Sequence, residues 1–358
     1  MILAMSSEPH LAETEQTPAP GESPQEGAPA PAPTKRRRYR RIALITLLVV
    51  VVLGAAGATA GGLYLHSVES DISRVDAFND VPAQTRPEKV VQDASNILLL
   101  GSDSRDPDNT KGSRSDTIII AHLTKDRSSA QLISIPRDTW VHVPAAKNSQ
   151  FGNRDAKINA SYAWGGIPLV VQTVEGFTGV RIDHVAIIDF GGFQQIIDAL
   201  GGIDIAVDQN FTSIHPPYRH FVKGTQHMDG ATALDYSRQR KQFADGDFAR
   251  IRHQQQVITA ILDKAASGGL LTNPGKLNSF LRATANSVSV DKTMSIIDLA
   301  AQLRHLRSGN LTFLTNPSSG TGMVGSESVV FADKTKDKAL YDAVRRDAVP
   351  EILRSNVK

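Results

Sequence analysis

The side chains with the greatest capacity for chemistry gather between residues 233 and 254, in the segments ALDYSRQR and DFARIRHQ. If residues 237–240 are extended, Arg238 and Arg240 lie on one side of the chain, because alternate side chains of an extended segment share a face. Two planar guanidinium groups placed in this way suit a pyrophosphate, since each can donate paired hydrogen bonds to phosphate oxygens. This spacing therefore indicates a diphosphate-binding segment.

A helix that begins near Asp247 places further polar side chains in one narrow sector, since successive residues turn by about 100°. The sector contains Asp247, Arg250 and Gln254, and it borders an apolar stripe of Ile251, Ile258 and Leu262. Ions buried without partners are strongly destabilising, so the sector either pairs internally or lines a ligand cavity. A pair between Asp247 and Arg250 leaves the other cations unexplained, which favours the ligand cavity.

Two acidic residues stand at the ends of predicted strands. Asp103 follows the apolar run 96–101 in the segment GSDSR, and Asp116 precedes the run 117–121 in the segment SRSD. If these strands are neighbours, both carboxylates converge on one Mg²⁺, which takes one or two carboxylates and completes its shell with phosphate oxygens and water. The alternative is that each aspartate only caps a turn.

Two more basic residues follow predicted strands or turns. Arg137 comes after a strand and after Pro136, which withholds a backbone donor, so its guanidinium is expected to project from the sheet edge. The alternative is a surface ion pair with Asp138. Lys157, in the segment KINA, is a weaker candidate because a lone lysine is ordinarily solvated.

The elements that must position these residues alternate along the chain. Short apolar runs predict buried strands at 96–101, 117–121, 131–136, 184–190 and 203–207. Helical periodicity predicts helices at 167–177, 193–200, 248–266, 276–288 and 295–306. Strands that alternate with helices in this way favour an α/β fold with its sheet covered on both faces.

The composition restricts the classes of function. The chain has 358 residues, of which 41% are hydrophobic, so it can bury a sizeable core. Its net charge of +2 provides no general field to attract nucleic acid, and no nucleic-acid partner is expected. The absence of cysteine excludes disulfide scaffolds, thiolate metal sites and a cysteine nucleophile.

One segment predicts a membrane anchor. Residues 42–65 contain no charge and are long enough to cross a bilayer as a helix. The preceding segment KRRRYRR carries six cations, which places the N-terminus in the cytoplasm and the bulk of the chain outside. A cleaved signal peptide is the alternative, with a small-residue site at Ala58–Ala60. The tail ahead of the anchor is rich in Pro, Ala and Glu and is expected to be disordered.

Seven segments in one order resemble the LytR-CpsA-Psr family, and together they span residues 95 to about 265. These segments are LGSDSR, SRSDT, SIPRDTWV, KINASYAWGG, DHVAIIDFGGF, DALGGIDI and ALDYSRQRK with DFARIRHQQQ. The resemblance implies an α/β/α sandwich with a central mixed sheet, in which an apolar tunnel holds a polyprenyl tail and its pyrophosphate lies at the mouth. Members of this family are cell-wall glycopolymer ligases.

The resemblance also implies a role for each matching residue. Asp103 and Asp116 look like the family's metal ligands for Mg²⁺, with Mn²⁺ as the alternative ion, and Arg137, Arg238, Arg240 and Arg250 look like its pyrophosphate-binding arginines. Lys157, Asp247 and Gln254 match further motif positions, and Arg105 and Arg114 are expected only to support the site. Asp247 either deprotonates the acceptor or is held by Arg250 in a structural role. His253 departs from the family pattern, because many relatives carry an arginine there.

The expected activity is a phosphotransferase that moves a glycopolymer from a polyprenyl-pyrophosphate carrier to peptidoglycan. Three alternatives remain: a polyprenyl-pyrophosphate phosphatase, a lipid-binding scaffold without turnover, and a transcriptional attenuator whose basic segment touches nucleic acid. We divide the chain into a disordered cytoplasmic tail (1–41), a transmembrane helix (42–65), an extracytoplasmic connector (66–93), a catalytic domain (94–315) and a C-terminal strand and helix extension packed on it (316–358). No further domain is expected after Ala348, so the catalytic domain is expected to act alone.

Overall fold

The computed structural model describes residues 64, 67–102, 115–147, 150–303 and 306–351. The chain separates into two units, 1–60 and 61–358, and all the described residues belong to the second. The predicted tail, the predicted membrane span except for Tyr64, and the predicted metal ligand Asp103 lie outside the described residues. Within the described part of the chain, none of the helices has both the length and the apolar composition that crossing a membrane requires.

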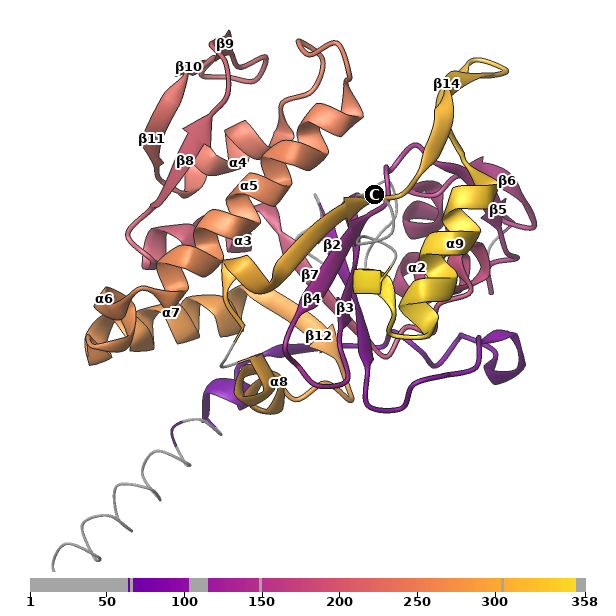
Figure 1. Ribbon diagram of the computed structural model, residues 1–358, viewed down its shortest axis with the longest axis horizontal. Coiled ribbons are helices and arrows are strands. Elements are labelled where there is room, and N and C mark those ends of the chain that lie inside the picture. Colours follow the sequence, from indigo (N-terminus) through magenta and orange to yellow (C-terminus); the bar gives the residue numbers. More distant parts are fainter. Residues whose placement is uncertain (1–63, 65–66, 103–114, 148–149, 304–305, 352–358) are drawn as a thin grey trace, which may run out of the picture. The chain divides into compact units, whose positions relative to one another are not determined.

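A seven-stranded mixed sheet forms the centre of the second unit (Figure 1). Its order is β1 (Ser73–Val75), β12 (Val288–Asp291), β7 (His184–Asp189), β2 (Ser95–Ser102), β3 (Ser115–Leu123), β4 (Ala130–Ser134) and β13 (Leu311–Thr315). The pairs β1/β12, β7/β2 and β4/β13 are parallel, whereas β12/β7, β2/β3 and β3/β4 are antiparallel. The predicted α/β fold with a central mixed sheet is therefore confirmed.

Helices cover both faces of this sheet because its central strands are apolar on both sides. On one face, Leu98 and Ile120 pack in a core with α2 (Ala160–Thr178) and α9 (Lys334–Arg345). On the other face, Ile97 and Ile119 pack in a second core with α5 (Asp247–Ala266), α7 (Pro274–Ser287) and α8 (Ile296–Leu303). Figure 1 shows these two helical layers on opposite sides of the sheet.

The helix predicted at 167–177 begins earlier than expected, at Ala160. The element α2 consists of two helical segments that meet at a kink at Gly165 and Gly166, and the predicted helix corresponds to the second segment. Gly166 has a φ of 63°, a conformation that glycine adopts without the steric cost of a Cβ atom. The pair of glycines therefore redirects the helix without ending it.

A third apolar core lies beside the sheet and is built largely from one continuous stretch of chain. The stretch contains α3 (Phe190–Ala199), β8 (Ile203–Val207), β9 (Phe211–Thr212), β10 (His220–Phe221), β11 (Gly224–Met228), α4 (Gly230–Arg238), α5 and α6 (Gly268–Leu271). The predicted strand at 203–207 is present as β8, but it pairs with β11 outside the central sheet. The expectation that 237–240 is extended is wrong at its start, because α4 continues to Arg238.

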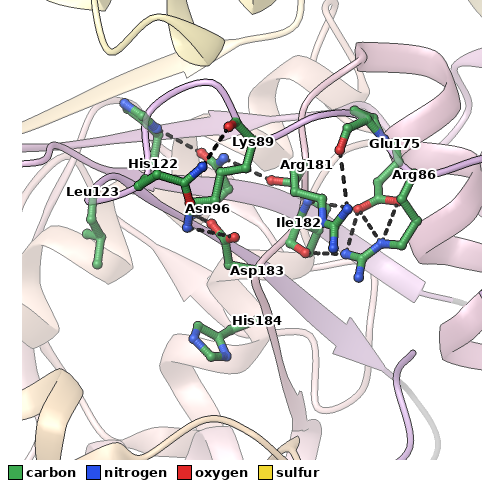
Figure 2. Close-up of polar contacts among 12 residues, drawn as sticks. Arg86, Lys89, Asn96, His122, Leu123, Glu175, Arg181, Ile182, Asp183 and His184 are labelled. Atoms are coloured by element: carbon green, nitrogen blue, oxygen red, sulfur yellow. Dashed lines mark hydrogen bonds and ion pairs between the residues drawn. The ribbon is translucent and has the colours of Figure 1, made fainter. Parts of the chain in front are cut away.

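We expected 66–93 to be a connector, but its described part, 67–93, packs on the domain and contributes the edge strand β1 and the short 3-10 helix η1 (Ala83–Thr85). Figure 2 shows how this segment is attached. The Arg86 guanidinium donates to the Glu175 carboxylate at 2.8 Å, and Lys89 Nζ lies 2.9 Å from Asp183 Oδ1. The segment is therefore part of the folded unit.

Two hairpins complete the fold on the side occupied by α2 and α9. One is formed by β5 (Trp140–Val143) and β6 (Arg154–Lys157), and the other by β14 (Ser318–Val324) and β15 (Glu327–Ala332). The second hairpin and α9 belong to the segment 316–358, and Tyr341, Val344 and Val349 of this segment lie in the core with α2. A second 3-10 helix, η2 (Ser308–Asn310), precedes β13.

Candidate active site

A cavity of about 500 Å³ opens between strands β2, β3 and β7 and helices α3, α4 and α5. Most of its wall is apolar, and the apolar side chains include Leu99, Ile119, Ala186, Phe193, Leu234, Val257, Ile258 and Ile261. A wall of this kind accommodates a hydrocarbon chain, because burying apolar surface contributes about 25 cal/mol per Å². The cavity therefore fits a ligand with a long apolar part.

The polar side chains on the same cavity are those that the sequence singled out. Asp116, Arg137, Arg238, Arg240, Arg250 and Gln254 all line it. They come from the start of β3, the turn after β4, the end of α4, the loop that follows and the first half of α5. Residues separated by up to 138 positions thus meet at one site, and it combines a cationic rim with an apolar interior.

Asp247 does not line the cavity, but its carboxylate forms ion pairs with two of the arginines that do. Arg250 Nη2 lies 2.8 Å from Asp247 Oδ1 and 3.0 Å from Oδ2, and Arg240 Nη1 lies 3.5 Å from Oδ1. The predicted structural pair is present, and it extends to Arg240. Because both oxygens of Asp247 are engaged by cations, the geometry assigns Asp247 to positioning the arginines.

The electrostatics of Arg250 favour an anionic ligand. Only 4% of this residue is exposed, and its Nε atom has no hydrogen-bond partner. Burial lowers the pKa of the Arg250 guanidinium, Asp247 opposes this effect, and repulsion from Arg137 and Arg240 adds to it. Cations that repel one another in a partly buried site are stabilised when a multivalent anion binds between them.

Asp138 forms ion pairs with three cations near the site, and the sequence predicted only one of these pairs. Its carboxylate lies 3.7 Å from Arg137 Nε, 3.8 Å from Lys157 Nζ and 3.6 Å from Arg240 Nη1. The predicted pair with Arg137 is therefore present, but it is one of three. Lys157 does not line the cavity; it joins Asp138 to Glu327, whose Oε2 lies 3.5 Å from Nζ. Asp138 thus links cations from three separate segments.

Phe190 positions Arg238, and the sequence analysis missed it. The Arg238 guanidinium carbon lies 4.6 Å from the centre of the Phe190 ring, a cation–π contact that orients the planar group. Phe190 follows Asp189, whose carboxylate accepts from Gly192 N and caps α3. The segment DFGGF was part of the family resemblance, so its aromatic residue was the signal for this contact.

His215 and Lys241 also line the cavity and were missed. Burial and the charge of Arg238 lower the pKa of the His215 imidazole. His215 lies in the loop before β10, and Lys241 lies in the loop after α4 at the end of the segment ALDYSRQRK. The spacing of neither residue marked it as part of the site. Only the packing of those loops places them there.

Gln239 fixes the chain between the two arginines of the segment SRQR. It is fully buried, and its Nε2 donates to Asp235 Oδ1 at 2.6 Å and to Ser213 Oγ at 2.8 Å. Its Oε1 accepts from Ile214 N at 3.2 Å. Because Gln239 points inward, Arg238 and Arg240 on either side point to the rim. Both arginines line the cavity, but the end of α4 positions them in place of the extended segment that we expected.

Asp116 is the described half of the predicted metal site. It lines the cavity, its side chain is 23% exposed, and it forms an ion pair with Arg137. Among the residues that the structure describes, no three His, Cys, Asp or Glu side chains gather as a metal-binding group. A partly exposed carboxylate facing the cavity nevertheless fits Mg²⁺, which uses few protein ligands and completes its shell with phosphate and water.

His253 faces the third core, away from the cavity. It is 1% exposed, and its ring centre lies 4.4 Å from that of Tyr236 and 5.0 Å from that of Phe243. Burial lowers the pKa of His253 to about 4, so the ring is neutral near pH 7. The position where many relatives were expected to carry arginine is thus a core position here.

The fold and the site define an α/β protein with a largely apolar cavity that is also lined by several basic side chains. The family comparison is in accord with this class: the chain belongs to the LytR_cpsA_psr family, whose sequence model matches residues 65–345. The resemblance seen in the sequence is therefore confirmed.

Two curated relatives are similar over much of the chain. One, from Bacillus anthracis, is named polyisoprenyl-teichoic acid–peptidoglycan teichoic acid transferase TagU; it is 36% identical over 245 residues, which cover 64% of this chain and 75% of that protein. Another, the cell wall biosynthesis protein LcpA of Corynebacterium glutamicum, is 32% identical over 306 residues, covering 72% of this chain and 57% of that protein.

Solved structures show the same fold. The crystal structure of B. subtilis TagV matches with a TM-score of 0.60 and 28% identity, covering 71% of this chain and 97% of that one. The LytR-Csp2A-Psr enzyme from Actinomyces oris matches with a TM-score of 0.58 and 22% identity, covering 76% of this chain and 95% of that one. The second match supports the fold alone.

Proposed function

We propose that this protein is a phosphotransferase that moves a glycopolymer from a polyprenyl-pyrophosphate carrier to peptidoglycan in cell-wall assembly. The observation that carries the proposal is that Arg137, Arg238, Arg240 and Arg250 all line one largely apolar cavity. The transferase name of the relative TagU supports the same reaction class.

The shape of the site matches the two halves of such a carrier. The polyprenyl tail occupies the apolar interior, and the pyrophosphate lies among the arginines. Planar guanidinium groups bind phosphate oxygens through paired hydrogen bonds, and they do so most strongly where water is excluded. The pyrophosphate in turn offsets the repulsion among the rim cations, Arg250 above all.

In the reaction, a hydroxyl of the peptidoglycan attacks the phosphorus that carries the glycopolymer. A bond forms between the acceptor oxygen and this phosphorus, and the bond from the phosphorus to the bridging oxygen of the pyrophosphate breaks. Polyprenyl phosphate leaves, the hydroxyl proton passes to solvent or a nearby base, and a phosphodiester remains. The arginines stabilise the charge that grows on the phosphate oxygens, usually the dominant contribution in phosphoryl transfer.

Mg²⁺, with Mn²⁺ as the alternative, is proposed as the cofactor, held by Asp116 and Asp103. Asp103 lies outside the described residues, and Asp116 is placed on the rim beside Arg137. When bound, the ion supplies positive charge at the non-bridging phosphate oxygens. Asp116 and Arg137 then hold opposite charges on the same side of the pyrophosphate.

We also propose that residues 42–65 anchor the protein in the cell membrane with the catalytic domain outside. The support is the uncharged composition of this segment and the six cations of KRRRYRR ahead of it. The carrier lipid is confined to the membrane, so an anchored domain meets it at a raised effective concentration.

The test uses the full-length protein in detergent with a synthetic polyprenyl-pyrophosphate glycan, Mg²⁺ and purified peptidoglycan. Wild type is expected to form polymer-linked peptidoglycan, and Arg238→Ala is expected to lose at least about 100-fold in rate, the effect of removing one group that stabilises transition-state charge. Arg282→Ala is the matched control, because Arg282 is about half exposed and lies outside the cavity. Chelation with EDTA is expected to stop the reaction, and added Mg²⁺ or Mn²⁺ to restore it.

The products separate the rival activities. Release of free phosphorylated glycan in the presence of peptidoglycan would identify a hydrolase, and tight binding of the carrier without any product would identify a lipid carrier. Either result contradicts the proposed transfer. Full activity in EDTA would contradict the proposed metal.

A further inference from the structure

The outward face of the β5–β6 hairpin carries a row of polar and aromatic side chains that begins at the active site. Trp140 pairs with Lys157 across the hairpin, and His142 pairs with Asp155. Paired residues share a face, and residues two apart along a strand share it too. These four side chains therefore lie on one face, and the opposite face, which includes Val141, packs in the core.

A groove of about 840 Å³ runs along this face, between the hairpin, β15 and α9. Its lining includes Trp140, His142, Asp155, Phe177, Phe331 and Asp337. The volume lies within the range of about 300–1,000 Å³ typical of small-molecule sites. Figure 1 shows β5, β6 and α9 together on the α2 side of the sheet.

The groove and the arginines of the cavity are connected through Asp138. Lys157, at one end of the row, lies 3.8 Å from Asp138, whose carboxylate also lies 3.7 Å from Arg137 Nε and 3.6 Å from Arg240 Nη1. The Asp138 carbonyl accepts a hydrogen bond from Val330 N at 2.9 Å, which ties the turn after β4 to β15. A chain lying in the groove would therefore lead toward the cations that hold the pyrophosphate.

Asp337 gives the groove an acceptor without a partner. The residue is only 6% exposed, and neither carboxylate oxygen takes part in a hydrogen bond. Burial raises the pKa of Asp337 to about 6, and the Asn316 side chain, which approaches it outside regular hydrogen-bond geometry, offsets this only in part. Buried acceptors of this kind are costly unless a ligand or water donates to them.

We propose that this groove binds the glycan strand of the peptidoglycan acceptor. Aromatic rings such as Trp140 stack on the apolar faces of sugar rings, and carboxylates such as Asp155 and Asp337 accept from their hydroxyls. Lys338 Nζ lies 2.6 Å from Asp342, and Arg345 Nη1 lies 3.4 Å from it. Because Lys338 and Arg345 are paired with Asp342, and Asp155 and Asp337 add negative charge, the groove does not favour a polyanionic donor chain.

The inference rests on the proposed transfer, and its test measures binding without turnover. Full-length protein in detergent is titrated with soluble N-acetylglucosamine–N-acetylmuramic acid oligosaccharides by calorimetry. Trp140→Ala is expected to weaken glycan binding at least tenfold. Asp155→Ala, which alters a side chain 62% exposed and therefore does not threaten folding, is expected to weaken it severalfold.

Phe151→Ala is the matched control, because Phe151 is 52% exposed but lies outside the groove, stacked on Trp164. It is expected to bind the glycan as wild type does. All three variants are expected to keep wild-type affinity for polyprenyl pyrophosphate, because the groove residues do not line the apolar cavity.

Three results would overturn the inference: no glycan binding by wild type, equal binding by wild type and both groove variants, or an equal loss in Phe151→Ala. A loss of affinity for the donor glycopolymer in place of the acceptor glycan would also overturn it. The transfer assay tests the proposed function, and its result is independent of the binding titration that tests the groove. Polymer-linked peptidoglycan formed equally by wild type and the groove variants would leave the proposed function standing while removing the groove from it.

Discussion

Asp247 holds Arg250 through both carboxylate oxygens, with Arg250 Nη2 2.8 Å from Oδ1 and 3.0 Å from Oδ2. Arg250 lines the cavity whereas Asp247 does not, and Arg240 joins the pair at 3.5 Å. A single carboxylate thus sets the direction of two of the four cations expected to hold the pyrophosphate. The stability of the fold and the geometry of the site therefore depend on the same contact.

Asp247→Asn is expected to lower the free energy of unfolding by about 1.5–3 kcal/mol, the usual contribution of a hydrogen bond to a charged group. The cause is that Arg250 stays buried and loses its counter-charge. Urea unfolding monitored by circular dichroism measures the change. Asp245→Asn is the control, because its pair with Arg252 is exposed and is expected to contribute less than about 1 kcal/mol. Equal losses in the two variants would contradict this role for Asp247.

Phe190→Leu is expected to weaken pyrophosphate binding by about 2- to 30-fold, since a cation–π contact contributes about 0.5–2 kcal/mol. The substitution keeps an apolar side chain on the cavity wall but removes the ring under Arg238. Competition by inorganic pyrophosphate in the transfer assay measures the effect. Phe151→Leu is matched to it, because Arg154 lies over the Phe151 ring away from the cavity. Phe190 has no positioning role if both variants bind pyrophosphate equally.

Gln239→Leu is expected to destabilise the protein by about 1–3 kcal/mol, because it removes the buried hydrogen bonds that the Gln239 amide donates to Asp235 and Ser213 and accepts from Ile214 N. Pyrophosphate affinity should fall with it, since the chain between Arg238 and Arg240 is no longer held. Gln209→Leu, at an exposed position in the loop after β8, is the control and is expected to change stability by less than about 0.5 kcal/mol. Thermal unfolding and pyrophosphate titration of both variants measure these two effects. A Gln239→Leu protein with wild-type stability and wild-type affinity for pyrophosphate would refute the prediction.

His253 is expected to lower the unfolding free energy as the pH drops from about 6.5 to about 4, whereas Asp337, with a pKa raised to about 6, contributes in the opposite direction. The pKa of His253 is about 4 in the folded protein and near 6.5 when exposed, so in this window the unfolded state binds a proton that the folded state does not. Above pH 6.5 the ring is neutral in both states and contributes no pH dependence. The accumulated loss is about 3 kcal/mol at most.

Urea unfolding of wild type and His253→Phe between pH 4 and 8 tests whether His253 causes this pH dependence of the unfolding free energy. The variant keeps an aromatic ring in the third core and should show a shallower slope between pH 4 and 6.5. Some slope is expected to remain, because burial also lowers the pKa of His122. Identical slopes in the two proteins would show that His253 is not the group responsible.

The sequence by itself determined four of the seven strands of the sheet, β7, β2, β3 and β4, and the identity of most of the polar residues that line the cavity. Apolar runs such as 96–101 and 117–121 predict strands because side chains buried on both faces of a sheet must be apolar throughout. The arginines of the segment SRQR and of α5 stood out because cations beside an apolar stripe require a partner or an anion. Such signals are local in the chain, so they can be seen without the fold.

Only the tertiary structure decided which side chains meet. Asp138 looked like one half of a local ion pair, yet it joins cations from three segments. The sequence showed only that His253 departs from the family pattern, and the fold places its ring among aromatic side chains. Strand β8 has the pattern of a central strand but pairs with β11 outside the main sheet. Contacts between distant segments depend on strand order and helix packing, and a local pattern contains neither.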